Sequence, residues 1–382
     1  MKGAVACIFL LFACLVNSNP IEDITKDILR DKEELPPRFI QFADSGDTLH
    51  TVDLEAPVDY ELLEEVTRNP ANNEYWLYTR SNRNNAQILT HGNVNSVRNS
   101  NFDANKQTVI IAHGWLSNGN TEPNPTVRTA YLNKLDVNII TVDWRRLALS
   151  DYTTAALGVP AVGRGVGEFL VWLNANFGAR FDNMHLVGFS LGAHLVGNAG
   201  RAAGGRIARV TGLDPAGPLW NYNSNRLGPN DGVFVEAIHT DGGYTVGGLG
   251  IGTAIAQVDF FPNGGISQPA CYTNICNHNR AWELFGATVS YNHLEGRLCT
   301  SNLQITWNTC RGVALRMGND DLRKTGKVKG IQENWFVLSP TQCIATIFES
   351  CGRAARSRHE QKEFRGDDAR SPAPRAALGV TA

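Results

Sequence analysis

The sequence has little charge of either sign. Charged residues make up 19% of its 382 positions, and the formal net charge at pH 7 is −2. Proteins that bind nucleic acid carry an excess of Lys and Arg that clusters on one face. This composition shows no such excess, so we expect no nucleic-acid partner.

Long apolar runs are also missing after the first residues of the chain. No later segment has eighteen uninterrupted apolar residues, which is about the length that a membrane-spanning helix needs. At the start, Lys2 precedes a short apolar stretch that ends near Asn17 and Ser18. This pattern is typical of a secretory signal peptide. We therefore expect residues 1–18 to be a signal peptide and the mature protein to be soluble, secreted and extracellular.

Cysteine is scarce, and two of the 8 cysteines lie in the predicted signal peptide. An even number remains, which favours disulfides over metal ligation or free thiols in an exported chain. Pairing neighbours would close two short loops, 271–276 and 299–310. Zinc is the alternative for Cys271, Cys276 and His278, but C-x4-C-x-H is not a familiar zinc spacing. The six remaining cysteines are Cys271, Cys276, Cys299, Cys310, Cys343 and Cys351.

Composition divides the rest of the chain into three regions. Residues 20–70 hold 14 Asp and Glu against 5 Lys and Arg and show no sustained apolar period, so we expect 19–70 to be an acidic, loosely ordered or removable leader. Residues 71–330 have dense apolar runs and are long enough for one large α/β domain. Residues 352–376 carry seven Arg and Lys among Ala, Ser and Pro, and we expect 331–382 to be a disordered tail.

Short β-branched runs alternate with helical patterns inside the central region. We predict strands over 108–112, 138–142, 184–189, 207–212 and 233–239, and helices over 163–177 and 191–203. This alternation predicts a mostly parallel central sheet with helices on both faces. Ligands bind beyond the carboxyl ends of the strands in such sheets.

A serine between two glycines lies at one of these strand ends. The sequence Gly188-Phe189-Ser190-Leu191-Gly192 follows an apolar run and precedes a predicted helix. G-x-S-x-G at a strand-to-helix junction is the nucleophile elbow of the α/β-hydrolases, in which the serine adopts strained backbone angles. The pattern alone is weak, because the chain has 37 glycines.

A nucleophilic serine needs a base and a carboxylate that orients the base. In α/β-hydrolases the acid and then the histidine follow the serine, which excludes His113 and Asp143. Asp214 ends the next predicted strand and is our candidate acid; a turn-capping role before Pro215 is the alternative. Among the later histidines, 239, 278, 293 and 359, we choose the one that follows Cys276, on a loop that a disulfide could hold. His278 is therefore the candidate base, and the strand-end His239 is the alternative.

The reaction also needs two N–H donors for the oxyanion. One is the backbone N–H after the nucleophile, that of Leu191. The loop His113-Gly114-Trp115 follows an early strand, and the N–H of Trp115 is the candidate second donor. We expect His113 itself to be structural.

Taken together, these motifs resemble the pancreatic lipase family, nearest to the single-domain secreted lipases of insects. The resemblance covers roughly residues 75–325. It implies the α/β-hydrolase fold, the catalytic residues Ser190, Asp214 and His278, the oxyanion donors Trp115 and Leu191, and the disulfides Cys271–Cys276 and Cys299–Cys310. The matching stretches are Ile111-Ala112-His113-Gly114-Trp115-Leu116, Gly188-Phe189-Ser190-Leu191-Gly192-Ala193-His194, Thr211-Gly212-Leu213-Asp214-Pro215-Ala216, Ala237-Ile238-His239-Thr240-Asp241, Val258-Asp259-Phe260-Phe261-Pro262-Asn263-Gly264-Gly265 and Cys276-Asn277-His278.

Departures from the family pattern sharpen the expectations. Only four residues separate Cys271 from Cys276, where vertebrate digestive relatives have a long amphipathic lid, so we expect weak or absent activation by opening of that lid. Asn223 and Gly228 stand where calcium-binding carboxylates would be expected, and we predict no metal and no cofactor. The tail is too short for the family's C-terminal β-sandwich, so no colipase partner is expected.

These features predict a secreted lipase that hydrolyses acylglycerols and makes peripheral contact with lipid surfaces. The short loop between the cysteines favours the alternative, a phospholipase of the A-1 type or a galactolipase. The long apolar loop 243–258 favours a triacylglycerol lipase; we expect Tyr244, Val246, Leu249 and Ile251 to face an apolar ligand there, the alternative being a buried glycine-rich loop. A third hypothesis is a non-catalytic, yolk-like protein that carries lipid. Such a protein would be expected to lack the nucleophilic serine.

Overall fold

A computed structural model describes residues 38–43, 48–68, 73–243, 247–324 and 334–338. The predicted signal peptide, the first part of the acidic leader, Tyr244, Val246 and the tail from 339 lie outside these ranges.

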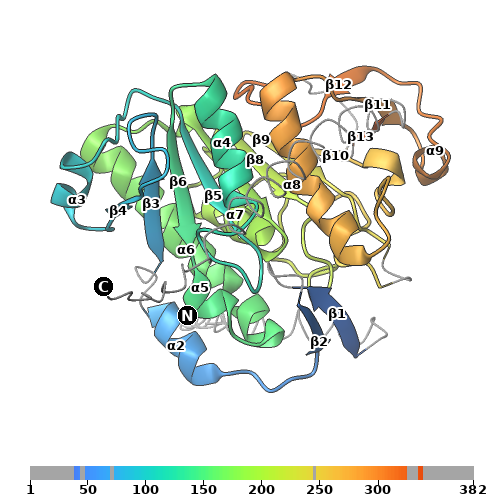
Figure 1. The fold of residues 1–382 in the computed structure, drawn as a ribbon, viewed down its shortest axis with the longest axis horizontal. Helices are drawn as coiled ribbons and strands as arrows, with labels where there is room; N and C mark the ends of the chain where they lie inside the picture. The colour runs from blue at the N-terminus through green and yellow to red at the C-terminus, as the bar shows by residue number, and fades with distance from the viewer. Residues whose placement is uncertain (1–37, 44–47, 69–72, 244–246, 325–333, 339–382) are drawn as a thin grey trace, which may run out of the picture. The chain divides into compact units, whose positions relative to one another are not determined.

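The described part is built around an 11-stranded sheet with the order β12-β11-β13-β10-β9-β8-β7-β5-β6-β3-β4 (Figure 1). The strands from β6 to β13 in this order are parallel, and the strands at either edge are antiparallel. This is the predicted mostly parallel sheet, and the fold is that of the α/β-hydrolases. The strands are β3 (Glu74–Tyr78), β4 (Gln87–Leu89), β5 (Thr108–Ala112), β6 (Asn138–Asp143), β7 (Met184–Phe189), β8 (Arg209–Leu213), β9 (Phe234–Ile238), β10 (Val258–Phe260), β11 (Glu295–Cys299), β12 (Ala314–Arg316) and β13 (Asn334–Leu338).

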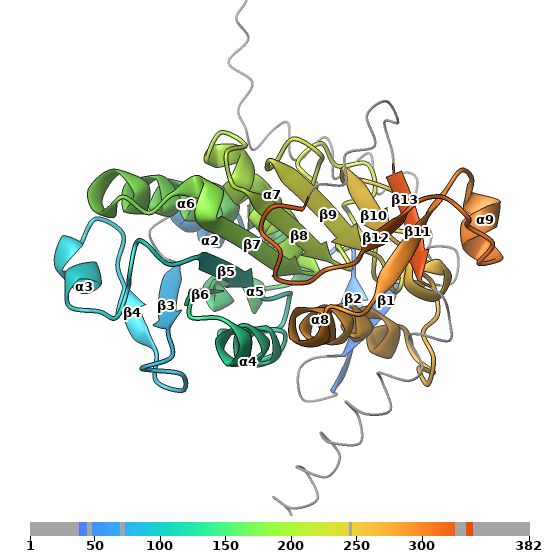
Figure 2. The ribbon, with the colours of Figure 1, turned by 90° about the horizontal axis from the view of Figure 1, so that it is seen from above.

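Helices cover both faces of the sheet, as predicted (Figure 2). Helices α6 and α7 pack on each other over one face, and α4 and α8 pack on each other over the other. Shorter helices lie at the periphery. The helices are α2 (Tyr60–Arg68), α3 (Val94–Arg98), α4 (Asn124–Lys134), α5 (Arg145–Ala148), α6 (Tyr152–Phe177), α7 (Leu191–Ala202), α8 (Asn274–Tyr291) and α9 (Asn302–Thr306).

Helix α6 is longer than the predicted helix over 163–177. It begins at Tyr152, where Asp151 caps it by accepting a hydrogen bond from the Thr154 N–H, and it continues through Pro160. Its length and apolar composition would suffice to cross a membrane, but 78% of its most apolar window is buried inside the protein. Burial of nearly every side along this length is typical of a core helix.

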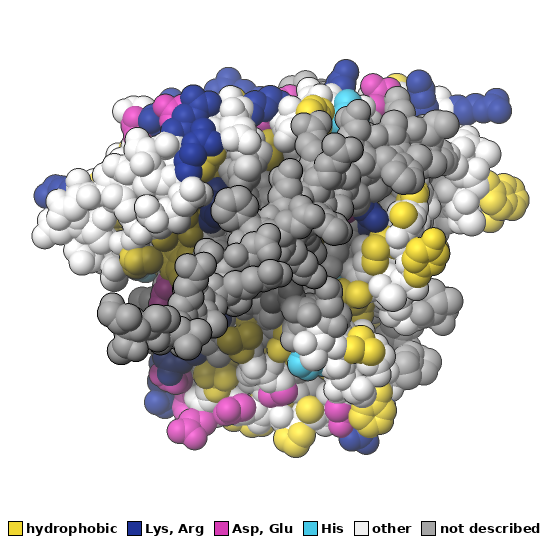
Figure 3. Space-filling view, in the orientation of Figure 1, with side chains coloured by type: hydrophobic (Ala, Val, Ile, Leu, Met, Phe, Trp, Pro, Cys, Tyr) yellow, Lys and Arg dark blue, Asp and Glu magenta, His cyan; other side chains and the backbone are white. Residues whose placement is uncertain are grey.

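The chain before residue 70 differs from the loosely ordered leader that composition predicts. Strands β1 (Phe39–Ala43) and β2 (Leu49–Asp53) form an antiparallel hairpin, and α2 follows them. Leu63 and Val66 of α2 are buried in the main hydrophobic core. The acidic side chains Glu61, Glu64 and Glu65 are exposed, and Figure 3 shows acidic side chains gathered over this edge of the molecule. The high charge therefore belongs to the solvent face of an amphipathic helix.

Candidate functional site

The serine of the predicted elbow lies between β7 and α7. Ser190 has φ 56° and ψ −124°, a left-handed conformation that costs energy in a residue with a side chain. A Cβ added to Gly188 would lie 2.0 Å from the carbonyl oxygen of Gly192, and one added to Gly192 would lie 2.4 Å from the carbonyl oxygen of His113. Only glycine therefore permits these close approaches, as the sequence predicted for the strained turn.

The neighbouring strand end carries the predicted carboxylate. Asp214 follows β8 directly and is fully buried. Its Oδ1 accepts hydrogen bonds from the N–H groups of Thr240 (2.7 Å) and Asp241 (3.1 Å). Its Oδ2 lies 2.5 Å from Nδ1 of His278. Both carboxylate oxygens are thus held in place, and one of them orients the imidazole.

His278 joins this carboxylate to the elbow. The centroid of its ring lies 4.6 Å from that of Phe189, the residue that precedes Ser190 in the chain. Within the described residues, the buried Nε2 has no hydrogen-bond partner. An imidazole with Nδ1 on a carboxylate and Nε2 unpaired is arranged to accept a proton at Nε2. His278 Nε2 and Ser190 are thus not hydrogen-bonded to each other, and hydrogen bonds of this kind often tighten only when substrate is bound.

The histidine lies on a helix and not on the predicted loop. Helix α8 begins at Asn274 after Thr273, whose side chain accepts a hydrogen bond from the N–H of Cys276. His278 is therefore in the second turn of α8. The N-terminal cap Thr273, followed by a run without proline or glycine up to Gly286, is the signal that would have predicted this helix.

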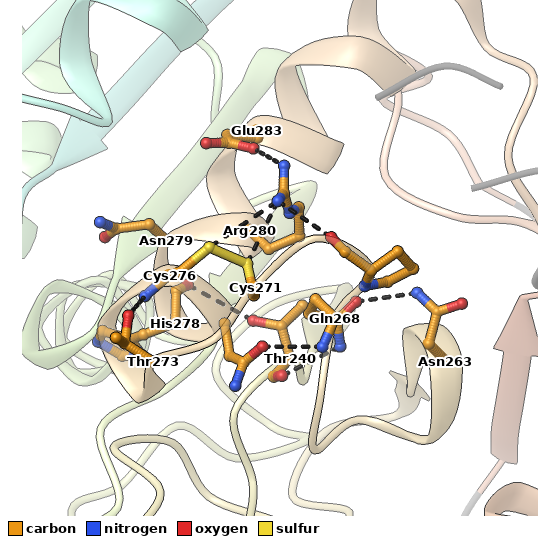
Figure 4. Close-up of a disulfide and its surroundings, with 12 residues drawn as sticks. Thr240, Asn263, Gln268, Cys271, Thr273, Cys276, His278, Asn279, Arg280 and Glu283 are labelled. Carbon is orange, nitrogen blue, oxygen red and sulfur yellow. Dashed lines mark hydrogen bonds and ion pairs between the residues drawn. A yellow bond between two sulfur atoms is a disulfide. The ribbon is translucent and has the colours of Figure 1, made fainter. Parts of the chain in front are cut away.

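The predicted disulfide holds the start of this helix. Cys271 and Cys276 are bonded, with their Cα atoms 5.3 Å apart. Arg280 donates to the sulfur of Cys271 and to the carbonyl oxygen of Pro269 (Figure 4). Gln268, which sequence reasoning missed, donates a hydrogen bond to the carbonyl oxygen of Thr240. The second predicted disulfide, Cys299–Cys310, is also present.

The alternative base is occupied elsewhere. Nδ1 of His239 lies 2.7 Å from the carbonyl oxygen of Ile251, and Nε2 lies 2.8 Å from Oδ1 of Asp259. Both ring nitrogens are therefore engaged in structural hydrogen bonds. His293 follows the end of α8, and His359 lies outside the described residues.

The predicted oxyanion loop lies against the serine. A Cβ added to Gly114 would lie 2.9 Å from Cβ of Ser190. Trp115 is fixed by a hydrogen bond from its indole N–H to the carbonyl oxygen of Ser150 (2.8 Å). His113 packs on Trp144, whose indole N–H donates to the His113 carbonyl oxygen (2.9 Å), which fits the predicted structural role. On the other side of the serine, Leu191 is the first residue of α7, so its N–H has no acceptor within the helix.

A second carboxyl group lies beside the first and was not anticipated. Asp241 is buried, and its Oδ2 accepts a hydrogen bond from the N–H of Leu249 (2.8 Å). Burial and the neighbouring Asp214 carboxylate raise the pKa of Asp241 to about 8. At neutral pH the Asp241 side chain is therefore mostly a neutral carboxylic acid.

Two of the four side chains that were expected to face lipid are buried. Leu249 and Ile251 belong to the hydrophobic core, and Gly250 pairs with Ala216. The alternative, a buried glycine-rich loop, is correct for these two residues. The remaining two, Tyr244 and Val246, lie in the part of the loop that the structure does not describe.

The family's calcium site does not fit the residues present. Asn223 and Gly228 supply no carboxylate, and the side-chain oxygen of Asn223 already accepts from the N–H of Asn225. The remaining buried acid, Asp231, accepts two hydrogen bonds from the guanidinium of Arg201 (3.0 and 3.2 Å). A fixed guanidinium thus supplies the positive charge here. Elsewhere in the described chain, Asp214, Asp241 and His278 lie close enough to share an ion, but these are the groups already bonded to one another.

We predict that a chelator leaves the melting temperature of the protein unchanged, whereas Arg201→Gln lowers its stability. The substitution removes charge-assisted hydrogen bonds from a buried carboxylate, and the expected loss is about 1–3 kcal/mol. Thermal and urea unfolding with and without EDTA would measure both effects. A melting temperature that falls in EDTA and returns with Ca²⁺ would contradict this account of Asp231.

The chain is similar in sequence to pancreatic lipases. Mouse pancreatic triacylglycerol lipase is 34% identical over 294 residues, which cover 70% of this chain and 63% of that protein. Human pancreatic lipase-related protein 2 is 37% identical over 229 residues, covering 58% of this chain and 49% of the relative. The chain thus spans less than two thirds of the length of these relatives. An Aspergillus awamori acetyl xylan esterase structure matches at a TM-score of 0.28 and 11% identity, covering 65% and 80% of the two chains, too weakly to add to the argument. Residues 41–336 match the Lipase family, and the chain therefore belongs to that family.

Proposed function

We propose that the protein is a secreted carboxylic ester hydrolase that cleaves acylglycerols through an acyl-enzyme. The observation that carries this proposal is the buried His278, with Nδ1 on Asp214 and Nε2 unpaired beside the elbow that holds Ser190. Family membership and the names of the triacylglycerol lipase relatives support the substrate class. The signal-like residues 1–18 and the two disulfides support secretion.

The proposed reaction has two stages, acylation and deacylation, and in each stage Nε2 of His278 accepts a proton and then gives it up. Ser190 Oγ attacks the acyl carbonyl while Nε2 of His278 takes the hydroxyl proton, and Asp214 stabilises the imidazolium that forms. The N–H groups of Leu191 and Trp115 donate to the oxyanion. The imidazolium then protonates the departing alcohol. Nε2 of His278 then takes a proton from a water molecule, whose oxygen attacks the acyl carbonyl. The bond between the acyl carbon and Ser190 Oγ breaks, His278 returns the proton to Ser190 Oγ, and the fatty acid is released.

The alternative substrate is a phospholipid or galactolipid, cleaved by the same residues. It is favoured by the four-residue loop between Cys271 and Cys276, since a large polar headgroup needs an open approach to the serine. A fatty-acid release assay that compares emulsified triacylglycerol with phosphatidylcholine tests the ranking. We expect faster release from triacylglycerol. Dominant cleavage of phosphatidylcholine would overturn this order while leaving the proposed ester hydrolysis intact.

The Cys271–Cys276 disulfide is predicted to affect both stability and the proposed activity. Closing this loop of sequence separation 5 should contribute about 2 kcal/mol, and the bond also fixes the first turn of the helix that carries His278. The double variant Cys271→Ser/Cys276→Ser should therefore lose stability and several-fold in kcat. Urea unfolding and the hydrolysis of a dissolved nitrophenyl ester would measure the two effects.

The second disulfide provides the matched control. Cys299–Cys310 has a sequence separation of 11, and its removal should cost about 3 kcal/mol. Its cysteines pack in a separate small apolar cluster with Phe261 and Ile305, so Cys299→Ser/Cys310→Ser should leave kcat of the folded protein nearly unchanged. Equal losses of kcat in both double variants would show that the first bond has no special role at the site.

A further inference from the structure

The β1–β2 hairpin lies directly against the catalytic groups proposed above. The ring of Phe42 meets the ring of Trp115 edge to face at 5.2 Å and that of His278 at 6.1 Å, centroid to centroid. Figures 1 and 2 both show the hairpin beside the N-terminal end of α8. One aromatic side chain from the start of the protein thus touches both the predicted oxyanion loop and the predicted base.

The site beneath this hairpin is closed. Ser190 is 2% exposed, His278 is fully buried, and Phe42 itself is 6% exposed. An acylglycerol must bring its ester carbonyl to Ser190 Oγ and place its acyl chain alongside. Because Ser190 and His278 are both buried, an element over the site has to move before such a substrate can reach the serine.

The hairpin is built in a way that allows this movement. Its two strands pair with each other and form a sheet separate from the 11-stranded sheet of the described chain. An isolated two-stranded ribbon is marginally stable by itself and depends on what it packs against. The inward face is apolar, with Ile40, Phe42 and Val52 in the main core.

A firm attachment follows the hairpin and provides a fixed point. The carbonyl oxygen of Ala56 accepts a hydrogen bond from the Thr153 hydroxyl (3.0 Å), and the N–H of Asp59 donates to the Thr154 hydroxyl (2.9 Å). Both threonines lie in the buried first turn of α6. The chain is thus anchored just beyond β2, and the hairpin can swing about this point without unfolding α2.

We propose that the β1–β2 hairpin is the mobile cover of the catalytic site and that it opens against an apolar lipid surface. This inference rests on the proposed function. Opening exposes Ile40, Phe42 and Val52, which is unfavourable in water and favourable against acyl chains. In this proposal the lipid surface activates the enzyme by opening the hairpin. The shortness of the loop between Cys271 and Cys276 then does not weaken this activation, because that loop is not the element that covers the serine.

Hydrolysis of tributyrin below and above its solubility limit tests the cover. We expect wild-type activity to rise sharply once droplets form. Phe42→Ala should hydrolyse dissolved tributyrin roughly five-fold faster or more, because a weaker closed state raises the open population, while its rate on droplets changes less than two-fold. The control is Leu63→Ala, a buried apolar truncation in α2 that lies against α6 and not at the site. It should lose stability and leave the rate on dissolved tributyrin unchanged.

Hydrogen exchange on the wild-type protein provides a readout that needs no variant. The amides of 39–43 and 49–53 should exchange roughly ten-fold faster with an emulsion of a trialkylglycerol ether, which cannot be hydrolysed, while those of β7 stay protected. Unchanged exchange in the hairpin, together with a wild-type rate for Phe42→Ala on dissolved tributyrin, would overturn the cover. If the wild type hydrolyses tributyrin in neither form, the proposed function fails, and the exchange measurement still decides on the cover.

Discussion

Replacing Ser190 by alanine is expected to lower ester hydrolysis by about 10⁴-fold or more. The serine lies in the strained turn between β7 and α7, and the unpaired Nε2 of His278 is the nearby base. Alanine removes the nucleophile and leaves the backbone N–H groups in place, so a small residual rate from binding and oxyanion stabilisation is the expected remainder. Initial rates on a short-chain nitrophenyl ester and on emulsified triacylglycerol would measure the loss.

Two comparisons make this result informative. Ser290→Ala makes the same change on an exposed position near the end of α8, and it should keep the wild-type rate. A serine-directed phosphonate should label the wild type and fail to label Ser190→Ala. If the wild type hydrolyses no ester while still binding lipid, the protein is a silent lipid carrier of the yolk-like kind.

Local chemistry was sufficient to predict the central strands and the elbow. The runs 108–112 and 184–189 are β-branched or apolar and end at glycine or polar turn residues, and the structure confirms their bounds. Each strand is covered on both faces of the sheet, so its residues are apolar or hydrogen-bonded. A strand of this kind appears in the sequence as a continuous apolar run, without an alternation of polar and apolar residues. The left-handed φ of Ser190 was predictable because Gly188 and Gly192 flank it.

The hairpin could not be predicted from composition, because its apolar residues are spread over a highly charged segment. Ile40 and Phe42 are separated by Gln41, but the neighbours on their other sides, Phe39 and Ala43, are also apolar, and each strand spans only five residues. Their partners, Trp115 and His278, are far away in the sequence. A contact of this kind follows from tertiary packing and leaves no local signal. The role of Asp241 could not be predicted for the same reason, because Asp214 comes close to it only through the pairing of β8 with β9.

The last prediction separates the two buried carboxyl groups of this pair. Asp214→Asn should lower kcat by about 10³–10⁴-fold, because an amide in place of the carboxylate favours the wrong imidazole tautomer and cannot stabilise the imidazolium. Asp241→Asn should keep the rate within about ten-fold, since the native side chain is mostly a neutral acid at pH 7 and an amide resembles it. Purified variants assayed on the same dissolved ester give this comparison. A larger loss in Asp241→Asn would assign the orienting carboxylate to the other residue.

Stability against pH provides an independent test of the same pair. The pKa of Asp241 is raised from 3.8 to about 8 in the folded protein by burial and by Asp214. The folded state then binds more protons than the unfolded state between these values, so this group's contribution to stability is complete below pH 3.8 and is lost as pH rises through about 8. Asp241→Asn removes that titration. Urea unfolding between pH 6 and pH 9 should show wild-type stability falling relative to the variant, and parallel curves for the two proteins would contradict the raised pKa.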